Sequence, residues 1–475
     1  MSTETRFQQV SIKRLFGKWD YDIHIEDRFL IIHGKNGIGK TKVLEIIKAT
    51  SELILDQLVY LPFEEVSIKY SDDLCLTVVR QENDLMKTAD GLELRPLKIK
   101  LSKPGKDPLK TSSNMHERVY SVAETGHWRH IDGSLWEDVR DGEIREFERI
   151  TEGPLTRRRP YSKRLEKLLE EEGIISLELR SSFDDPRILQ NIKDELKDRE
   201  VYIIKTQRLH YIDASRSRPV KFSPRNSSLS QMEIVQQSHT IRDRILEAQK
   251  QSSNLTQELD RKFPGRILDI QVRVNAGNNE EVLRKKIAEQ NTKRNQLAEV
   301  MSVKEDISVL DSDVLKSGTE WEPWQRNVIS LYLEDTEKKL AVFDSILDRI
   351  TLLGELLKDK LFDKKIKITE EEGIEIWDQS IENRKIPLTS LSSGEQHEII
   401  LYTDLLFNVK ENSLVLIDEP EISLHVAWQE KFVKDVKHIA DLANFNFIIA
   451  THSPDIVSGY RKHMIRLDGP KGTVR

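Results

Sequence analysis

The sequence predicts an α/β fold, with a mixed sheet whose two halves are separated by a helical insertion. Three observations support this prediction. An apolar stretch near the N-terminus runs directly into a glycine-rich loop. Further apolar stretches that end in polar residues lie in the last hundred residues, where strand–helix alternation resumes. Long polar segments with helical periodicity lie between these two regions.

This pattern divides the chain into five parts. The two outer parts and one short middle part are expected to form a single discontinuous domain. The parts are 1–102, the N-terminal part of that domain; 103–200, an irregular and helical insertion; 201–225, a short strand with the segment after it; 226–384, a helical insertion suited to partner binding or oligomerisation; and 385–475, the C-terminal part of the domain.

Composition excludes several classes of protein. With 81 acidic and 74 basic residues, the net charge of the 475-residue chain is −7, so any nucleic-acid site must be a local basic patch. Cys75 is the single cysteine, which excludes a disulfide framework and a zinc ribbon. No apolar run approaches the roughly 18 residues of a membrane span. Because the first residues also lack the features of a signal peptide, we expect a cytoplasmic protein.

The first hundred residues predict strands and one helix. Short apolar or alternating stretches are typical of strands, and the segment after the glycine-rich loop has a helical apolar face. The expected strands are 10–16, 21–25 and 29–33, the expected helix begins at Lys40, and 65–70 with 74–80 is the expected hairpin.

The glycine-rich loop fits G-x-x-x-x-G-K-[ST], a phosphate-binding pattern that follows a strand and opens a helix. Its backbone N–H groups and the helix N-terminus would hold phosphate oxygens. Lys40 would neutralise the β- and γ-phosphates, and the Thr41 hydroxyl would ligate Mg²⁺. The residues of the pattern are Gly34, Lys35, Asn36, Gly37, Ile38, Gly39, Lys40 and Thr41.

Two apolar stretches near the C-terminus end in residues suited to phosphate chemistry. The run 414–417 ends in Asp418, a candidate Mg²⁺ ligand beside the loop, and Glu419, a candidate general base. The run 447–450 is followed by His452, placed to contact a γ-phosphate. Taken alone, each of these residues would more often be a strand terminus or a structural histidine; together with the loop, the functional interpretation is favoured.

A second anion-binding segment precedes an expected helix at 398–407. Hydroxyl and N–H groups at a helix N-terminus form a second anion site, which suggests that two chains grip each nucleotide. The alternative is a capping box without function, because Ser392 and Glu395 fit S-x-x-E. The segment consists of Ser392, Ser393, Gly394, Glu395 and Gln396.

The middle of the chain predicts long helices. We expect a pair at 230–262 and 280–301 around the turn Phe263-Pro264-Gly265, and one helix over 324–361. A packed helical subdomain is the favoured interpretation of this region, and a partner-binding coiled-coil arm is the alternative. Trp321 and Trp324, which flank Pro323, offer apolar surface for partner contact.

The series GKNGIGKT, Gln207 in VYIIKTQRL, LSSGEQ, LVLIDEP and His452 in IIATHSP resembles the Walker A, Q-loop, signature, Walker B and switch-histidine motifs of ABC-type ATPases. The two halves around a helical insertion are similar to the SMC and DNA-repair branch. The segments DEPEISLH and LFGKWDYDI resemble the stand-alone AAA-15/21 or OLD-like ATPases of bacterial anti-phage systems. They are similar in particular to the PtuA type of Septu systems, also found beside retrons, and the AriA ATPase of PARIS systems is a relative of that type.

The resemblance implies an ABC-type (SMC-like) ATPase head with ATP and Mg²⁺ as ligands. Gln207 would contact ATP and share Mg²⁺ with Thr41 and Asp418. The signature segment would act across an ATP-linked homodimer or higher homo-oligomer, and the partner would be an HNH nuclease of the PtuB kind. The D-loop would be Ser423, Leu424 and His425, which depart from the transporter pattern. The alternatives are a Toprim-like effector, a DNA-acting SMC or repair-type ATPase, and a scaffold with slow turnover.

Two basic patches and three aromatic residues complete the candidates. Both patches fit a solvated or partner-facing surface, with nucleic-acid phosphates as the alternative ligand. Phe16, Trp19 and Tyr21 are candidates to stack on adenine or to lie in the core. The first patch is Arg157, Arg158, Arg159, Lys163 and Arg164; the second is Lys205, Arg208, Arg216, Arg218, Lys221 and Arg225.

Overall fold

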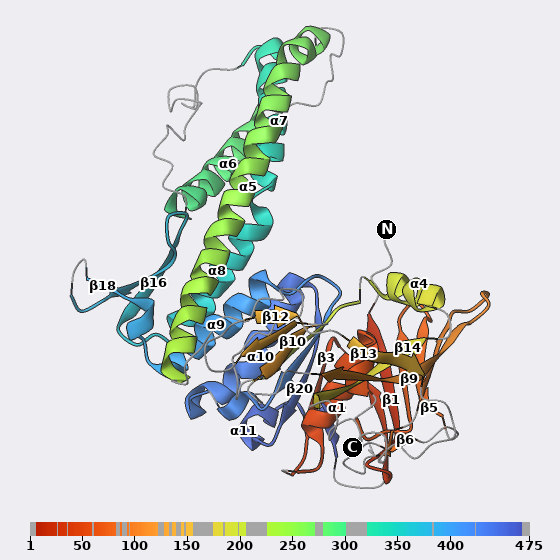
Figure 1. Ribbon diagram of the computed structural model, residues 1–475. Coiled ribbons are helices and arrows are strands. Elements are labelled where there is room, and N and C mark those ends of the chain that lie inside the picture. The colour runs from red at the N-terminus through yellow and green to blue at the C-terminus, as the bar shows by residue number, and fades with distance from the viewer. Residues whose placement is uncertain are drawn as a thin grey trace. The chain divides into compact units, whose positions relative to one another are not determined.

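The chain forms two compact units, each made of separate stretches of sequence (Figure 1). The sheet unit comprises Met1–Thr206, Lys410–Pro420 and Asn444–Arg475, and the helical unit comprises Gln207–Val409 and Glu421–Ala443. The computed structural model describes residues 6–467 except 26, 36, 59–60, 82–85, 88–92, 95, 122–127, 133–134, 139–143, 147–148, 155–173, 184–185, 198, 206–225, 271–278, 301–320, 382–383 and 423.

A five-stranded parallel sheet lies in the sheet unit, in the order β15-β19-β20-β3-β21. Every residue of β19 and β20 is buried, as their continuous apolar sequences require of a strand covered on both faces. The strands are β3 (Phe29–His33), β15 (Val201–Lys205), β19 (Leu414–Asp418), β20 (Asn446–Thr451) and β21 (Met464–Arg466).

An antiparallel sheet forms the rest of this unit, in the order β13-β9-β8-β5-β4-β1-β2, with β14 also paired to β9. Buried and exposed residues alternate along its described strands, so one face lies in the core. The strands are β1 (Phe7–Leu15), β2 (Trp19–His24), β4 (Glu65–Tyr70), β5 (Cys75–Arg80), β8 (Leu97–Ser102), β9 (Leu109–Ser121), β13 (Arg149–Pro154) and β14 (Ile174–Phe183).

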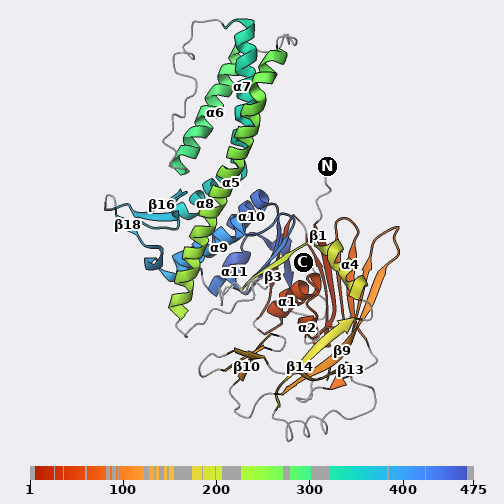
Figure 2. The same ribbon diagram turned by 45° about the horizontal axis from the view of Figure 1, so that its top comes forward.

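Helix α1 (Lys40–Ser51) joins the two sheets, because it contacts β15, β19 and β20 on one side and β4 on the other (Figure 2). One hydrophobic core cluster includes residues from α1 and from both sheets. The smaller elements of the unit are α2 (Leu55–Leu58), β6 (Met86–Lys87), β7 (Glu93–Leu94), β10 (Trp128–Asp132), β11 (Leu135–Asp138), β12 (Ile144–Glu146), α4 (Pro186–Leu196), α11 (Pro454–Val457) and η3 (Arg461–His463).

The N-terminal strands, the helix at Lys40 and the hairpin follow the sequence prediction, but 103–200 does not. We expected an irregular and helical segment there, and the described residues instead form strands β9 to β14 and helix α4. The first half of β9, Lys-Thr-Ser-Ser-Asn, has few apolar residues, so its strand periodicity is weak in the sequence. The stretch 155–173, which includes the helix expected near Leu165, lies outside the described residues.

The helical unit consists of helices and one small three-stranded sheet. Helices α5, α6 and α7 run alongside one another (Figure 1), and α9 packs against α5, α8 and α10. The elements are α5 (Asn226–Ile270), α6 (Glu280–Val300), α7 (Pro323–Ala341), α8 (Asp344–Lys358), β16 (Lys364–Thr369), β17 (Gly373–Asp378), β18 (Lys385–Ile386), η1 (Leu388–Ser390), α9 (Ser393–Phe407) and α10 (Val426–Ala443); η2 (Pro420–Ile422) lies where the chain enters this unit.

The helical unit differs from the sequence prediction in four respects. Helix α5 continues through Pro264, where we expected a turn. The expected single helix over 324–361 is two helices, α7 and α8, interrupted at residues 342–343. The three-stranded sheet β16–β18 was not predicted, although Lys-Ile-Lys-Ile in β16 and Ile-Glu-Ile in β17 alternate as strand residues do. Helices α9 and α10 also belong to a different compact unit from β19 and β20, although the sequence division placed all of them within 385–475.

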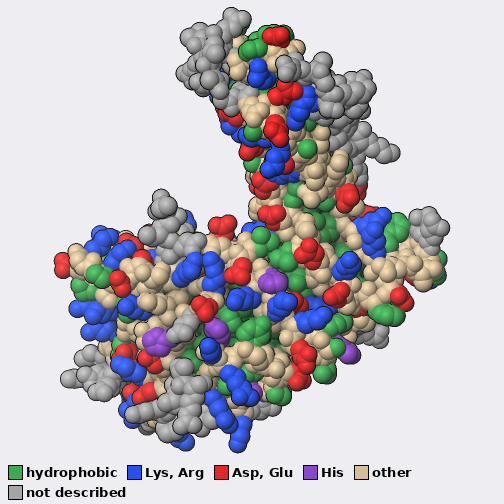
Figure 3. Space-filling model, turned by 180° about the vertical axis from the view of Figure 1, so that it is seen from behind, with side chains coloured by type: hydrophobic (Ala, Val, Ile, Leu, Met, Phe, Trp, Pro, Cys, Tyr) green, Lys and Arg blue, Asp and Glu red, His purple; other side chains and the backbone are tan. Residues whose placement is uncertain are grey.

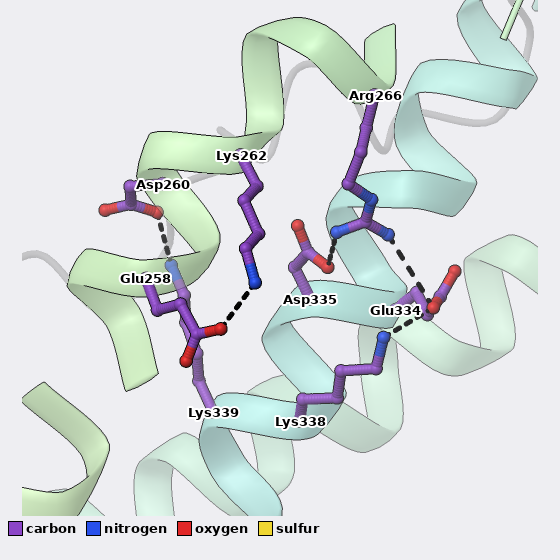
Figure 4. A network of polar contacts seen from close by, with 8 residues as sticks. All are labelled: Glu258, Asp260, Lys262, Arg266, Glu334, Asp335, Lys338 and Lys339. Atoms are coloured by element: carbon purple, nitrogen blue, oxygen red, sulfur yellow. Dashed lines mark hydrogen bonds and ion pairs between the residues drawn. The ribbon is translucent and has the colours of Figure 1, made fainter. Parts of the chain in front are cut away.

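Ion pairs join α5 to α7 on both sides of Pro264 (Figure 4). Arg266, two residues after Pro264, pairs with the buried Asp335 of α7 and lies 3.7 Å from Glu334. Further along α7, Lys339 pairs with Asp260 of α5 at 2.8 Å. Exposed pairs of this kind contribute about 0–1 kcal/mol each, and the desolvation of the partly buried Arg266–Asp335 pair offsets much of its attraction.

No described helix is both long enough and apolar enough to cross a membrane.

Candidate functional site

The glycine-rich loop connects the end of β3 to the start of α1. Gly37 and Gly39 have φ angles of 81° and 101°, which L-residues with a side chain rarely adopt. A Cβ at Gly39 would also lie 2.6 Å from Cε2 of the Phe16 ring. Both constraints require glycine at position 39. The resulting loop conformation places its backbone N–H groups at the N-terminus of α1, the positive end of the helix dipole.

The Lys40 side chain folds back over this loop. Its ammonium group donates hydrogen bonds to the carbonyl oxygens of Gly34 (3.0 Å) and Lys35 (3.3 Å), and the residue is only 4% exposed. Ile38 packs partly buried against the core, and Thr41 occupies the first turn of α1. The loop therefore has one buried cation at its centre and a hydroxyl beside it, whereas Asn36 lies outside the described residues.

The carboxyl ends of β3, β20 and β19 lie side by side at one edge of the parallel sheet. The register pairs Thr451 with His33 and Asp418 with Ala450. Strand β20 thus lies between the loop strand β3 and β19, so His452 follows the strand next to the loop, and Asp418 is one strand further away than we expected. Asp418 is buried, at 8% exposure.

Glu419 and His452 approach each other at this edge. The Nδ1 atom of His452 lies 4.0 Å from Oε1 of Glu419, and their side chains are 41% and 20% exposed, respectively. Glu419 has a positive φ of 48°, and its N–H donates to the carbonyl of Ala450 at 2.8 Å. Non-glycine residues held in this conformation are concentrated at functional sites, and this one brings a carboxylate and an imidazole together.

The signature segment begins α9 in the helical unit. Ser392 and Glu395 form a capping box, in which the Glu395 carboxylate accepts from the Ser392 N–H (2.9 Å) and hydroxyl (2.8 Å). Lys364 of β16 donates to the same carboxylate at 2.5 Å. Burial alone would raise the pKa of Glu395, but the hydrogen bonds from Lys364 and Ser392 hold this pKa below its ordinary value.

Gln396 also holds the chain before α9. Its amide donates to the carbonyl oxygens of Leu388 (3.4 Å), Thr389 (3.2 Å) and Leu391 (3.0 Å). Because Glu395 and Gln396 point inward, Ser393 and Gly394 are the members of this segment, together with Ser392, that reach the surface. The capping box is therefore present in the structure. It leaves the first turn of α9 accessible to a ligand.

The segment after β19 places a tryptophan beside Gly394. The position of a Gly394 Cβ lies 3.6 Å from Cζ3 of Trp428, and the Trp428 ring centroid lies 5.6 Å from that of the exposed His425. Leu424 is 7% exposed and packs inside, whereas Ser423 lies outside the described residues. Sequence reasoning missed Trp428 and Lys364; the occurrence of Trp428 in the first turn of α10, three residues after His425, was the available signal.

The remaining candidates are the three aromatic residues, Gln207 and the two basic patches. Tyr21 is 2% exposed and lies in the core, where burial raises the pKa of its phenol. Phe16 is 40% exposed, contacts Trp19 edge-on at 5.8 Å between ring centroids, and lies against Gly39, so Phe16 is the aromatic side chain at the loop. Gln207, the patch at 157–164 and the side chains of the patch at 205–225 lie outside the described residues.

The site offers few protein ligands for a metal. Within the described part of the chain, no group of three or more His, Cys, Asp or Glu side chains is arranged to hold a metal ion. A magnesium ion at a nucleotide needs only one or two protein oxygens, since phosphates and waters supply the rest. The Thr41 hydroxyl and the buried Asp418 carboxylate are hard oxygen donors, so their chemistry fits such an ion.

Comparisons with known proteins give weak likeness to solved structures. The Smc head domain with an extended coiled coil, bound to the C-terminal domain of ScpA, from Pyrococcus furiosus is 12% identical; 97% of this chain and 93% of that chain are covered, with a TM-score of 0.36. The SMC head domain from Thermotoga maritima is 12% identical, with 97% and 94% covered and a TM-score of 0.30. These low scores carry no conclusion about this chain.

Two matches at the level of sequence differ greatly in extent. Protein ea59 of Escherichia phage lambda is 31% identical over 124 residues, which is 25% of this chain and 23% of that protein. The AAA-15 family, described as an AAA ATPase domain, matches residues 14–457. This range contains the phosphate loop, Asp418, Glu419 and His452. A match over nearly the whole sequence places the protein in the AAA-15 family of AAA ATPase domains.

Proposed function

We propose that the protein binds ATP with Mg²⁺ and hydrolyses it. The observation that carries this proposal is the meeting, at one edge of the parallel sheet, of the loop holding the buried Lys40, the buried Asp418, and the Glu419–His452 pair at 4.0 Å. The loop N–H groups and Lys40 bind the phosphates. Thr41 and Asp418, with Gln207, would hold Mg²⁺, and the ion would neutralise phosphate charge.

Glu419 is the proposed general base. Its carboxylate accepts a proton from the water that attacks the γ-phosphorus, while the bond to the leaving ADP oxygen breaks. The constrained backbone of Glu419 fixes the direction of the carboxylate. The Nδ1 atom of His452 faces the same carboxylate. His452 therefore orients Glu419, and it also contacts the γ-phosphate.

We further propose that each ATP is shared by two copies of the chain. Ser393 and Gly394 present a hydroxyl and N–H groups at the start of α9, which is an anion-binding arrangement. Glu395 and Gln396 instead hold the local structure, with Ser392 as the cap. A triphosphate already held by one loop would take this second site from another copy, and the exposed His425 would lie at the same contact.

The resemblance to PtuA-type ATPases supports a role in cytoplasmic anti-phage defence, in which the ATP-linked homo-oligomer regulates a separate HNH nuclease. Exposed apolar side chains in the helical unit are available for such a partner, in particular Trp324 (65% exposed) and Leu268 (72% exposed). ATP can control the partner only if the partner binds the ATP-bound and the ATP-free states of the protein with different affinities.

The decisive experiment is Glu419→Gln. This change keeps size and hydrogen bonding but removes the proton acceptor, so ATP should still bind while hydrolysis slows about 100-fold or more. Binding of labelled ATP and release of phosphate are measured on the same preparations, with Glu421→Gln as the matched control on a neighbouring carboxylate. Hydrolysis at the wild-type rate in Glu419→Gln would remove this residue from the mechanism.

A further inference from the structure

The antiparallel sheet of the sheet unit has a polar face turned to solvent. Along β8, Leu97, Ile99 and Leu101 are buried, and Lys98 and Lys100 between them are exposed. On β9, Lys110 is likewise exposed. Because side chains alternate along a strand, these lysines share the outer face with the alternate residues of β1, β4 and β5.

Three of the outer-face lysines stand together. Lys100 pairs in register with Lys110, and Lys98 lies two residues along the same strand, about 7 Å away. Within the described residues, these three ammonium groups have no ion pair or hydrogen bond. Two other lysines of this face are neutralised: Lys13 by Glu65 at 2.8 Å and Lys69 by Asp73 at 3.4 Å.

The β8–β9 hairpin is basic in a protein that is acidic. Residues 97–112 contain five lysines and one aspartate, a net charge of +4 (5 minus 1), whereas the whole chain carries −7. Figure 3 shows Lys and Arg side chains clustered at its left, over the part of the sheet unit that holds β8, β9 and α4. Like charges directly opposite on neighbouring strands destabilise a sheet. A negatively charged partner would therefore reduce the repulsion between the lysines on β8 and β9.

The other outer-face residues suit a phosphate backbone. Ser67, Thr77 and Ser112 bring hydroxyl groups to the same surface, between or beside the lysines. Lysines and hydroxyls are the side chains that contact phosphate oxygens without reading sequence. The outward positions of β1, β4, β5 and β8 carry no aromatic side chain among the described residues, and aromatic stacking is what single-stranded nucleic acid requires.

We propose that the outer face of β5, β8 and β9, centred on Lys98, Lys100 and Lys110, binds the phosphate backbone of a nucleic-acid duplex without sequence preference. This surface lies wholly within the sheet unit, and its binding requires neither ATP nor a second copy. It gives the ATPase a second ligand, and it supports the alternative of a DNA-acting enzyme independently of any nuclease partner.

The test is the triple variant Lys98→Gln/Lys100→Gln/Lys110→Gln of the full chain. Fluorescence anisotropy with labelled duplex DNA and duplex RNA is measured without ATP, from about 50 to about 200 mM salt. In a plot of log affinity against log salt concentration, three phosphate contacts make the slope of the wild type steeper by roughly 2.7 than that of a protein without them. Over this salt range, these three contacts therefore account for a roughly 40-fold change in affinity. The triple variant should lose that part of the slope on whichever duplex binds.

The matched control is Lys13→Gln/Lys69→Gln, which removes two paired lysines from the same face and should change the slope little. Unchanged ATP binding and thermal unfolding confirm that both variants fold. Equal slopes for the wild type and the triple variant would overturn the proposal, as would an equal loss in the control. Displacement of the duplex by polyglutamate at equal charge concentration would also overturn it, in favour of an acidic protein partner.

Discussion

The lysines at positions 40 and 42 lie in the same helical turn but differ in every contact. Lys40 is buried over the loop carbonyls, whereas Lys42 is exposed and pairs with Glu45 at 2.7 Å. Lys40→Ala should abolish ATP binding, because it removes the buried cation of the loop. Lys42→Ala should leave affinity unchanged, since an exposed pair contributes about 0–1 kcal/mol. Equilibrium binding of labelled ATP measures both, and equal affinity in the two variants would contradict the assignment.

The residues of the site were predictable from sequence to different degrees. Lys40, Asp418 and Glu419 were predictable, because each belongs to a short contiguous sequence pattern. Their meeting was also predictable, because the carboxyl ends of parallel strands lie at one edge of the sheet. Lys364 could not be predicted as the partner of Glu395, because the two are 31 positions apart and only the β16–α9 packing joins them. The inward direction of Gln396 was equally hidden, since the pattern does not distinguish a ligand contact from a bond to the preceding turn.

At the scale of elements, the ion pair between β16 and α9 predicts a catalytic effect without direct contact. Lys364→Gln should loosen the turn before α9 and slow ATP hydrolysis several-fold, while ATP binding, which depends on the loop at Lys40, is unaffected. The control is Lys365→Gln, since Lys365 is exposed on the opposite face of β16. ATP affinity and hydrolysis rate are measured separately. A change in affinity with no change in rate would contradict this positioning role.

A buried charge cluster connects the end of α8 to α9 and α10: Lys360, Glu398, Tyr402 and Asp435. Lys360 binds Asp435 and Tyr402 and lies 3.7 Å from Glu398. Burial, opposed by Lys360 and reinforced by Asp435, raises the pKa of Glu398 to about 7. Below about pH 7, the buried carboxyl group of Glu398 is therefore mainly protonated in the folded protein.

This raised pKa predicts how stability depends on pH. A folded-state pKa above the ordinary value of 4.5 gives a contribution that is fully present below about pH 4.5 and is lost as pH rises to about 7. The loss amounts to roughly 3 kcal/mol at most. Glu398→Gln should flatten the profile of unfolding free energy against pH, measured with urea. A profile that overlays the wild type across this range would contradict the prediction.

A second carboxyl group makes the flattening partial. Burial and the nearby Asp404 raise the pKa of Glu233 in α5 to about 7 as well. The double variant Glu398→Gln/Glu233→Gln should therefore be flatter than Glu398→Gln alone. Both positions lie in the helical unit, so ATP binding at the loop serves as the control for folding of the sheet unit.

Elements with strong periodicity were predicted well, and elements shaped by distant contacts were not. Uninterrupted apolar runs predict strands β19 and β20, and an apolar face at helical spacing predicts α1. Pro264 predicts a break in α5, but the helix continues through it, and Arg266 beyond the proline pairs with Asp335 of α7. The strands within 103–200 were not predicted from the local pattern: β13 and β14 pair with β9, whereas β10, β11 and β12 pair with one another.

At the scale of the whole molecule, the shared nucleotide predicts complementation between two inactive chains. Lys40→Ala removes the loop site, and Gly394→Glu places a negative charge at the proposed second anion site. Neither variant alone should hydrolyse ATP. A mixture should recover activity, because each heterodimer contains one site with an intact loop and an intact signature turn. Phosphate release is measured after heterodimers are verified with two affinity tags; heterodimers that form without activity would contradict sharing.

The position of β3 has a consequence for how the protein is made. The neighbours of this strand are β20 and β21, and the pairing of Phe29 with Phe447 joins residues 418 positions apart (447 minus 29). At about 5–20 residues per second, the ribosome needs roughly 20 to 80 s to bridge that distance. Until then, the emerging chain has a phosphate loop without the strands that support it. Nucleotide binding is therefore among the last properties that a newly synthesised chain acquires.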